Sequence, residues 1–304
     1  MQFKPVTVDD YPSLKKYFEK QSFQLSTYSL FSIIVWSSQH LRTFFFVEND
    51  TLVILNELDN QPEERHLILP LSLTGVITPD FLYNLAKTVG IRKYCFIPET
   101  FLSMHDQNQI ESYFTVSEQP EFDDYIYLME DLVHLRGNKF AKQRNLINQF
   151  RKTHLSKGTV RIEMITVDNY IDCMEFLKIW CVQHNCDLDS NGSLACEKMA
   201  AINALRNLDR LDSKGILIRI DGVVSAFGIC SHLTHDMGIL NFEKAFSNIK
   251  GLYQFLDNEC AKRLFSSYKY INKESDMSLP NLAQSKNSYN PVMKLKSYCL
   301  TVVS

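Results

Sequence analysis

Apolar residues recur along this chain with two different periods, and the succession of the two predicts a mixed α/β architecture. The clearest stretch lies in the C-terminal half, where Met237–Ala245 predicts a strand, Asn248–Gly251 a polar turn and Leu252–Ser266 a helix. Three further elements are predicted after that helix: a strand at Tyr268–Asn272, a short helix at Pro280–Tyr289 and a last strand at Val292–Leu300.

The rest of the chain shows a similar succession. Asp221-Gly222 separates the apolar runs Ile216–Ile220 and Val223–His232, and an Asp-Gly pair between such runs predicts a β-hairpin. In the N-terminal half the predicted strands are Thr43–Glu48, Thr51–Glu57, His66–Ser72, Lys93–Ile97 and Asp124–Met129, and the predicted helices are Pro79–Val89 and Thr100–Tyr113. Both halves follow the order helix, hairpin, strand, helix, strand, helix, strand.

The first helix of each half begins with nearly the same residues. Thr7-Val8-Asp9-Asp10-Tyr11 recurs as Thr166-Val167-Asp168-Asn169-Tyr170, and the flanking sequences align without gaps. A threonine at this position is suited to cap a helix, and acidic residues are favoured in the first turn. This echo and the shared order of elements predict two tandem α/β domains, each with a mostly antiparallel sheet flanked by helices.

The segment between the halves carries charge of one sign. It has no acidic residue from Leu132 to Ile162, and Gly137–His154 predicts a helix with one apolar side. The apolar residues are Phe140, Leu146, Ile147 and Phe150, and the basic residues beside them are Lys139, Lys142, Arg144 and Arg151. This helix is either a solvated linker or a surface that binds an anionic ligand. We predict domains at 1–131 and 159–304, joined by this basic helix at 132–158.

Composition narrows the class of protein. The 304 residues are 45% hydrophobic, which suffices for two cored domains, and the net charge of −3 opposes a general attraction to nucleic acid or to anionic membranes. The N-terminus has no signal-peptide pattern, and no apolar run approaches the length of a membrane span. We therefore expect a cytoplasmic protein without integral membrane association.

The eight cysteines show no pattern of a disulfide or metal framework. Cys181, Cys186 and His184 are close in sequence, but zinc sites need a second matched pair of ligands, which is absent. Reduced, buried cysteines are the better interpretation, and we expect no bound metal.

Two blocks of the sequence resemble a known family. They are DYIYLMEDLVHLRGNKFAKQRNLINQF (124–150) and the region from NFEKAFSNIKGLYQFLDNECAKRL to SKNSYNPVMKLKSY (241–298). Both are similar to bacterial proteins named after the C-terminal domain of phosphatidylglycerol lysyltransferase, in a superfamily that includes the Fem-type aminoacyltransferases. The resemblance spans essentially the whole chain and implies two tandem GNAT-like (N-acetyltransferase-like) folds, in agreement with the repeated order of elements.

The resemblance also implies a donor site. A polar turn that opens a helix presents backbone N–H groups and suits phosphate, although an ordinary strand-to-helix connection looks the same. In GNAT-like folds this turn receives the pyrophosphate of acyl-coenzyme A, which here implies a donor-binding role for Asn248, Lys250 and Gly251. In the lysyltransferase and Fem-type relatives the donor is an aminoacyl-tRNA. Lys142 and Arg144 of the basic helix are the expected phosphate contacts, and no permanently bound cofactor is expected.

Four residues are catalytic candidates for acyl transfer, which requires no covalent intermediate: three for proton transfer, and Lys286 to neutralise phosphate or carboxylate charge. Glu243 lies on the strand before the turn and is a candidate base, with an ion pair to a lysine as the alternative. Lys286 and Tyr289 are three residues apart on a predicted helix and therefore share a face. Either tyrosine, Tyr289 or Tyr253, is suited to protonate the leaving group, and both are also typical core residues.

Asn272, Glu274 and Asp276 alternate at the end of a predicted strand. Polar groups at a strand end are suited to orient an amine-bearing substrate, and equally to cap the helix that follows. We treat them as candidate substrate-binding residues.

The leading hypothesis is an acyltransferase or aminoacyltransferase acting on an amine or hydroxyl of a small or lipid-linked acceptor. The alternative is a non-catalytic binding module that retains the cleft for a phosphorylated or anionic ligand. Ser278, Asn281 and Gln284 favour the alternative, because they stand where relatives commonly carry glycine or basic residues. A nucleic-acid binder using the basic helix is a third hypothesis, although we expect no exposed aromatic residues interleaved with its basic ones.

Overall fold

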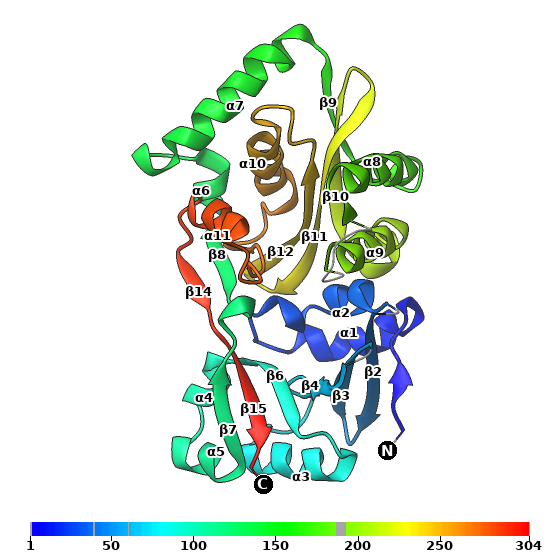
Figure 1. Ribbon diagram of the computed structural model, residues 1–304, viewed down its shortest axis with the longest axis vertical. Helices are drawn as coiled ribbons and strands as arrows, with labels where there is room; N and C mark the ends of the chain where they lie inside the picture. The colour runs from blue at the N-terminus through cyan, green and yellow to red at the C-terminus, as the bar shows by residue number, and fades with distance from the viewer. Residues whose placement is uncertain (1, 39, 60, 187–192, 304) are drawn as a thin grey trace. The chain divides into compact units, whose positions relative to one another are not determined.

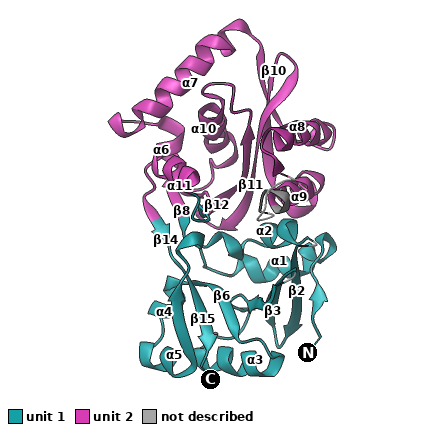
Figure 2. Ribbon diagram, viewed as in Figure 1, with its two compact units in different colours: residues 1–124, 275–279, 294–304 teal, residues 125–274, 280–293 magenta. Residues whose placement is uncertain are grey.

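The computed structural model of the chain describes residues 2–38, 40–59, 61–186 and 193–303, with no side-chain description for 193–196. It divides into two compact units, which are residues 1–124, 275–279 and 294–304, and residues 125–274 and 280–293 (Figures 1 and 2). Each unit contains one mixed sheet flanked by helices, which confirms the predicted mixed α/β class.

The first unit is built on a sheet with the order β1-β2-β3-β4-β6-β15-β7, in which β5 also pairs with β3. Its strands are Lys4–Pro5, Leu41–Glu48, Thr51–Leu58, Gln61–Leu67, Leu71–Ser72, Lys93–Pro98, Phe114–Glu118 and, for β15, Ser297–Val302. Its α-helices are α1 Tyr11–Glu19, α2 Leu30–Trp36, α3 Pro79–Val89, α4 Glu99–Ser103 and α5 Gln107–Tyr113. Among the described pairings of this sheet, only β4 and β6 run parallel.

The second unit is built on a sheet with the order β14-β8-β13-β12-β11-β10-β9. Its strands are β8 Asp124–Leu128, β9 Val160–Met164, β10 Lys214–Ile220, β11 Val223–Thr234, β12 Met237–Ala245, β13 Tyr270–Asn272 and β14 Met293–Leu295. Its α-helices are α6 Met129–His134, α7 Ala141–Thr153, α8 Tyr170–Gln183, α9 Ser193–Arg206, α10 Leu252–Leu264 and α11 Pro280–Asn287.

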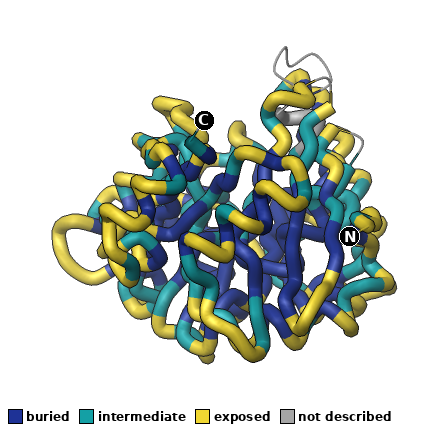
Figure 3. The backbone as a smooth tube through the Cα atoms, turned by 90° about the horizontal axis from the view of Figure 1, so that it is seen from below, coloured by how far each residue is buried: buried dark blue, intermediate teal, exposed yellow. Residues whose placement is uncertain are grey.

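Helices cover both faces of this second sheet. On β11, the Phe227 ring contacts the Phe176 ring of α8 at 5.7 Å, whereas a Cβ atom on Gly228 would overlap the Cys260 sulfur of α10. Successive residues of a strand point to opposite faces, so α8 and α10 lie on opposite sides of β11 (Figure 1). Figure 3 shows the burial of each residue along the chain, with buried residues on inner segments and exposed residues mostly on outer ones.

The repeated helix start is also repeated in structure. The backbone N–H of Thr7 donates to the Asp10 carboxylate at 3.0 Å, and the N–H of Thr166 donates to the Asn169 side-chain oxygen at 2.8 Å. Each contact ties the threonine to the side chain three positions later, as in a capping box, and an α-helix begins at the next residue, Tyr11 or Tyr170. The Asp221-Gly222 hairpin turn is confirmed, with φ angles of 51° and 84°.

The units differ from the predicted domain ranges in two ways. Strand β15, from the C-terminal end, joins the first sheet, while β8, expected in the N-terminal domain, joins the second. The predicted linker helix is also part of the second unit, because Phe150 of α7 stacks on Phe255 of α10 at 4.7 Å within the core. Sequence order alone could not show this exchange of strands.

Several element boundaries differ from the prediction for local reasons. The helix predicted at 100–113 is two helices, because the Asp106 side chain accepts the N–H of Asn108 and begins a new helix there. The strand predicted at 66–72 is interrupted at residues 68–70, the last of which, Pro70, has no N–H to donate. The last predicted strand, 292–300, is divided into β14 and β15 at Lys296.

Candidate functional site

The candidate site lies where β13 stops pairing with β12 in the second unit. The two strands are parallel, and their register ends with Asn272 opposite Ile239, although β12 continues to Ala245. Near this point β12 has an extra residue, since Ile229 pairs with Phe242 and Cys230 with Leu240. Such bulges redirect side chains and are frequent beside active sites.

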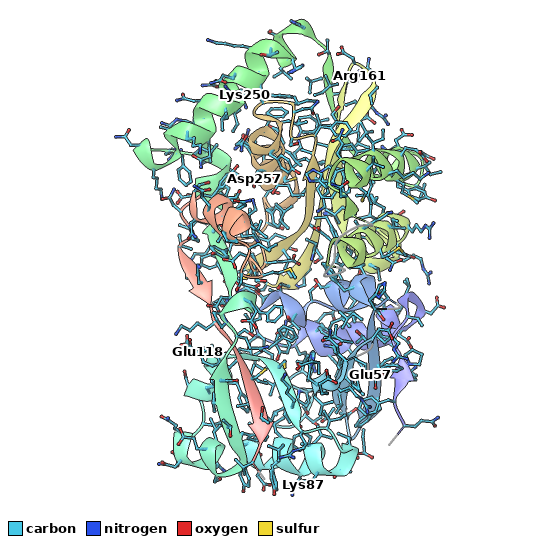
Figure 4. The ribbon with its side chains drawn as sticks, in the orientation of Figure 1. Glu57, Lys87, Glu118, Arg161, Lys250 and Asp257 are labelled. Carbon is cyan, nitrogen blue, oxygen red and sulfur yellow. The ribbon has the colours of Figure 1, made fainter. Side chains whose placement is uncertain are left out.

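Lys273 follows β13 directly and carries the central charge of the site. Its ammonium nitrogen lies 3.2 Å from Oε2 of Glu243 on β12 and 2.9 Å from Oδ2 of Asp257 on α10. Asp257 is only 2% exposed and extends from α10 into the interior (Figure 4). One ammonium group therefore joins two carboxylates that come from a strand and a helix.

The ionisation of these groups is strongly perturbed. Burial raises the pKa of Glu243 to about 7; the Asp257 charge adds to this rise and Lys273 opposes it. Burial alone would lower the pKa of Lys273, but the Asp257 and Glu243 carboxylates outweigh it and hold that pKa above its usual value. Glu243 therefore exchanges a proton near neutral pH, while Lys273 stays charged.

Two tyrosine rings enclose the ammonium group. The ring of Tyr289 lies 4.9 Å from Nζ of Lys273, and the ring of Tyr127 lies 5.9 Å away. The Tyr127 hydroxyl donates to the main-chain oxygen of Lys286 at 2.8 Å. Burial raises the pKa of Tyr289 well above its usual value, and the charges of Asp257 and Glu243 add to this effect, so Tyr289 stays protonated.

A polar pocket of about 250 Å³ adjoins this cluster and shares Tyr289 with it. It lies between α7, α10 and α11, and its other lining residues are Lys142, Gln143, Leu146, Gln254, Asn281, Gln284, Ser285 and Ser288. The lining contains four carboxamides and no carboxylate. The pocket is therefore suited to a ligand that forms hydrogen bonds, with one cation available for an anionic group.

Gln143 is a buried residue of the pocket lining whose side chain is held in place by a hydrogen bond. Its side chain is 3% exposed, and Nε2 donates to the main-chain oxygen of Ser288 at 2.7 Å. This contact fixes the amide so that Oε1 has no hydrogen-bond partner among the described residues. A buried acceptor left unpaired costs roughly 1–3 kcal/mol.

The structure brings together two of the four predicted catalytic residues, Glu243 and Tyr289, through Lys273. Lys286 has another arrangement, because its ammonium donates to the main-chain oxygens of Lys273 and Glu274. The predicted helix also ends at Asn287, so Tyr289 lies just beyond α11. Lys286 thus holds the segment that carries Lys273.

Tyr253 points to a different neighbour. Its hydroxyl accepts a hydrogen bond from the indole nitrogen of Trp180 in α8, at 3.3 Å. Burial raises the pKa of Tyr253, and its ring packs against the hydrophobic core of the unit. Its position is that of a core residue with a satisfied hydroxyl.

The predicted phosphate turn lies beneath α7. Asn248 and Lys250 are exposed, whereas Gly251 is buried with φ of +80°. A Cβ atom on Gly251 would overlap the main-chain oxygen of Leu146 and lie 3.2 Å from the Phe150 side chain. The glycine is thus required by the close approach of α7, whatever the turn binds.

The two basic residues predicted to contact phosphate have different environments. Lys142 is exposed and lines the pocket. Arg144 instead donates to the main-chain oxygens of Leu135 and Gly137, the second at 2.6 Å, and so fixes the connection between α6 and α7. The expectation that Arg144 faces solvent or a ligand is wrong for its Nη1 group.

The candidate substrate residues have local contacts. The side-chain oxygen of Asn272 accepts the N–H of Glu274 at 2.7 Å, and Glu274 accepts from Asn241, the bulged residue of β12, at 3.5 Å. Asp276 belongs to the 275–279 segment of the first unit and accepts the N–H of Ser278 at 2.9 Å. Asn272 and Glu274 lie together at the end of β13, and the role of the three residues in substrate binding stays a prediction.

Three residues of the site were not singled out from the sequence: Lys273, Asp257 and Gln143. Lys273 stands between the candidates Asn272 and Glu274, and alternation along a regular strand puts it on the opposite face. Asp257 did give a signal, since an acidic residue amid an otherwise apolar helix face is unusual. Gln143 gave none.

Two further expectations concern absences. Among the residues that the structure describes, no cluster of histidine, cysteine and acidic side chains is suited to hold a metal ion. Within the same ranges no helix has the length and apolarity needed to cross a bilayer.

Comparison with known proteins gives one family and several structural relatives. The model of the phosphatidylglycerol lysyltransferase C-terminal family matches residues 94–301, and no curated protein matches the chain. A conserved protein of unknown function from Bacteroides thetaiotaomicron is 27% identical, with a TM-score of 0.88 and coverage of 100% of both chains.

Two other solved structures are more distant. The C-terminal domain of a putative lysylphosphatidylglycerol synthetase from Agrobacterium fabrum is 12% identical, with a TM-score of 0.63 over 96% of this chain and 91% of that one. A tandem GNAT protein from the clavulanic acid biosynthesis pathway is 9% identical, with a TM-score of 0.45 over 98% of this chain and 97% of its own.

Proposed function

We propose that this chain, which belongs to the family of the phosphatidylglycerol lysyltransferase C-terminal domain, is an acyl- or aminoacyltransferase. The protein takes an acyl or aminoacyl group from acyl-coenzyme A or aminoacyl-tRNA and transfers this group to an amine or hydroxyl of a small or lipid-linked acceptor. The proposal rests on the environment of the Glu243 carboxylate. Burial raises the pKa of Glu243 to about 7, and contacts through Lys273 and Tyr289 connect this carboxylate to a polar pocket.

The proposed reaction uses this chain's residues for proton transfer. Glu243 accepts a proton from the acceptor amine or hydroxyl as that nitrogen or oxygen attacks the acyl carbonyl. The bond from the carbonyl carbon to the donor's sulfur or ribose oxygen then breaks, and the leaving atom takes a proton from Tyr289. Tyr289 regains a proton from water, and Glu243 releases its own. A general base whose pKa lies near the working pH is favoured for such a step.

The donor is proposed to bind near the start of α10. Lys142 and Lys250 are exposed cations on α7 and on the turn before α10, two segments that Gly251 joins by close packing. A helix N-terminus with cations beside it favours phosphate. Asn248 lies in the same exposed turn.

The test is a transfer assay with labelled donors. The full chain is incubated with labelled acetyl-coenzyme A, longer acyl-coenzymes or aminoacyl-tRNA, and with amine, hydroxyl and phospholipid acceptors. We expect turnover with one donor and its loss in Glu243→Gln with donor binding retained. The salt dependence of binding identifies the donor, because affinity for a tRNA falls much more steeply with salt than affinity for coenzyme A.

The second candidate is a binding module that has lost the chemistry. Asn281 and Gln284 favour it, since these uncharged side chains line the pocket where the family resemblance implies basic or glycine residues. A donor that binds without turnover under every condition, with affinity unchanged in Glu243→Gln, supports this candidate and rejects the catalytic assignment.

A further inference from the structure

We infer that Lys273 is a positioning residue: its ammonium clamps Glu243 beside Asp257 and thereby keeps Glu243 able to accept a proton. The inference rests on the function proposed above and deepens it, because it assigns the control of the base to a residue that does not line the pocket.

The position of Lys273 is fixed from several directions. Its backbone N–H donates to the main-chain oxygen of Tyr125 at 3.0 Å, and its own main-chain oxygen accepts from the Lys286 ammonium. Its side chain is 11% exposed and lies between the rings of Tyr127 and Tyr289. The ammonium is therefore held at the two carboxylates and does not reach out to a substrate.

The charges around Glu243 explain what the clamp does. Two carboxylates share one ammonium in a buried site, so without Lys273 one of them must take up a proton. Asp257 is deeper, at 2% exposed, and has one oxygen without a partner among the described residues. The titratable side chains that act on Glu243 or feel its charge are Asp257, Cys260, Tyr253, Lys273, Lys286, Tyr127 and Tyr289.

Opposite effects of two substitutions distinguish this role from a plain structural ion pair. In Lys273→Met the charge that favours ionised Glu243 is lost, so Glu243 should titrate at a higher pH, by about one unit or more. In Asp257→Asn the competing carboxylate is neutral, so Glu243 should titrate at a lower pH than in the wild type. A residue needed only for folding would lower activity without moving the titration in either direction.

Lys244 provides a matched control. It is a neighbouring lysine, 6% exposed, with its own ion pair to Glu197 and its ammonium 4.2 Å from the Trp180 ring. Because successive residues of β12 point to opposite faces, Lys244 does not face Glu243. Lys244→Met should therefore disturb a buried ion pair while leaving the titration of Glu243 in place.

The experiment records two readouts on the full-length chain. One is the acid limb of kcat/KM against pH, and the other is the ¹³C NMR titration of glutamate side-chain carboxyls, with Glu243 assigned by its absence in Glu243→Gln. The inference expects an upward shift in Lys273→Met, a downward shift in Asp257→Asn and none in Lys244→Met. If the Lys273→Met variant does not fold, the shift of the Glu243 titration in Asp257→Asn decides whether the inference holds.

An unmoved Glu243 titration in Asp257→Asn and in any folded Lys273→Met overturns the inference. If no donor is ever turned over but the NMR titrations move as stated, the proposed function fails while the clamp on Glu243 stands.

Discussion

The main-chain oxygen of Leu146 occupies the space that a Cβ atom on Gly251 would take. This contact joins α7, which carries the basic residues, to the start of α10. It makes the helix between the two repeats a part of the candidate site.

Gly251→Ala should therefore destabilise the second unit. The substitution imposes a left-handed conformation on alanine and forces α7 away from α10, for a combined loss on the order of 3 kcal/mol in the free energy of unfolding. Chemical denaturation measures this. Gly222→Ala is the control, because Gly222 has φ of +84° but nothing within 4 Å of its Cβ position. Equal losses in the two variants would mean that the contact with Leu146 contributes nothing.

Lys142 and Arg144 should separate into a binding and a structural role. Lys142→Ala should weaken donor binding about tenfold with no change in thermal stability, because Lys142 is exposed at the pocket. Arg144→Ala should lower stability by about 1–3 kcal/mol, because two main-chain oxygens lose a charged donor. Isothermal titration calorimetry and thermal melts test both, and the reverse pattern contradicts the assignment.

Stability of the first unit should decrease as the pH falls below about 6.5, because of His66. Burial lowers the pKa of this histidine, whose Nδ1 lies 2.8 Å from the Glu64 main-chain oxygen and whose Nε2 lies 3.3 Å from the Asn56 amide nitrogen. Since the folded pKa lies below the unfolded one, the unfolded chain binds more protons in this window. The contribution of neutral His66 to the free energy of unfolding is then fully present above about pH 6.5. It declines as the pH falls, by at most about 1.4 kcal/mol per pH unit.

Denaturation midpoints from pH 5 to 8 measure this effect, with His66→Gln removing it. The control variant is His235→Gln, because the side chain of His235 is 94% exposed. A dependence on pH that survives in His66→Gln would assign it to other groups.

The sequence predicted the fold well where local chemistry decides. The Asp221-Gly222 turn, the strand Met237–Ala245 and the apolar side of the basic helix were all predictable, because turn residues and periodicity act over a few positions. The exchange of β8 and β15 between the sheets was not, because pairing between distant strands leaves no local signal.

The candidate site was predicted only in part for a related reason. Glu243 and Tyr289 were identified by their positions on a predicted strand and a predicted helix, but their connection depends on Lys273, whose two partners come from distant segments. Alternation along a regular strand cannot identify Lys273, because it puts that residue on the face opposite to Asn272 and Glu274. The end of β13 at Asn272 and the extra residue in β12 change the local direction of the chain.

The pH dependence of transfer by the wild type and by Glu243→Gln tests the central claim most directly. The account predicts that wild-type kcat/KM rises with pH through a single ionisation near 7, where burial places the pKa of Glu243. It further predicts that the Glu243→Gln variant does not show this rise with pH. The rate of the variant should be about 10²–10⁴-fold lower, while donor binding is retained. Wild-type rate and an unchanged acid limb in Glu243→Gln would contradict it.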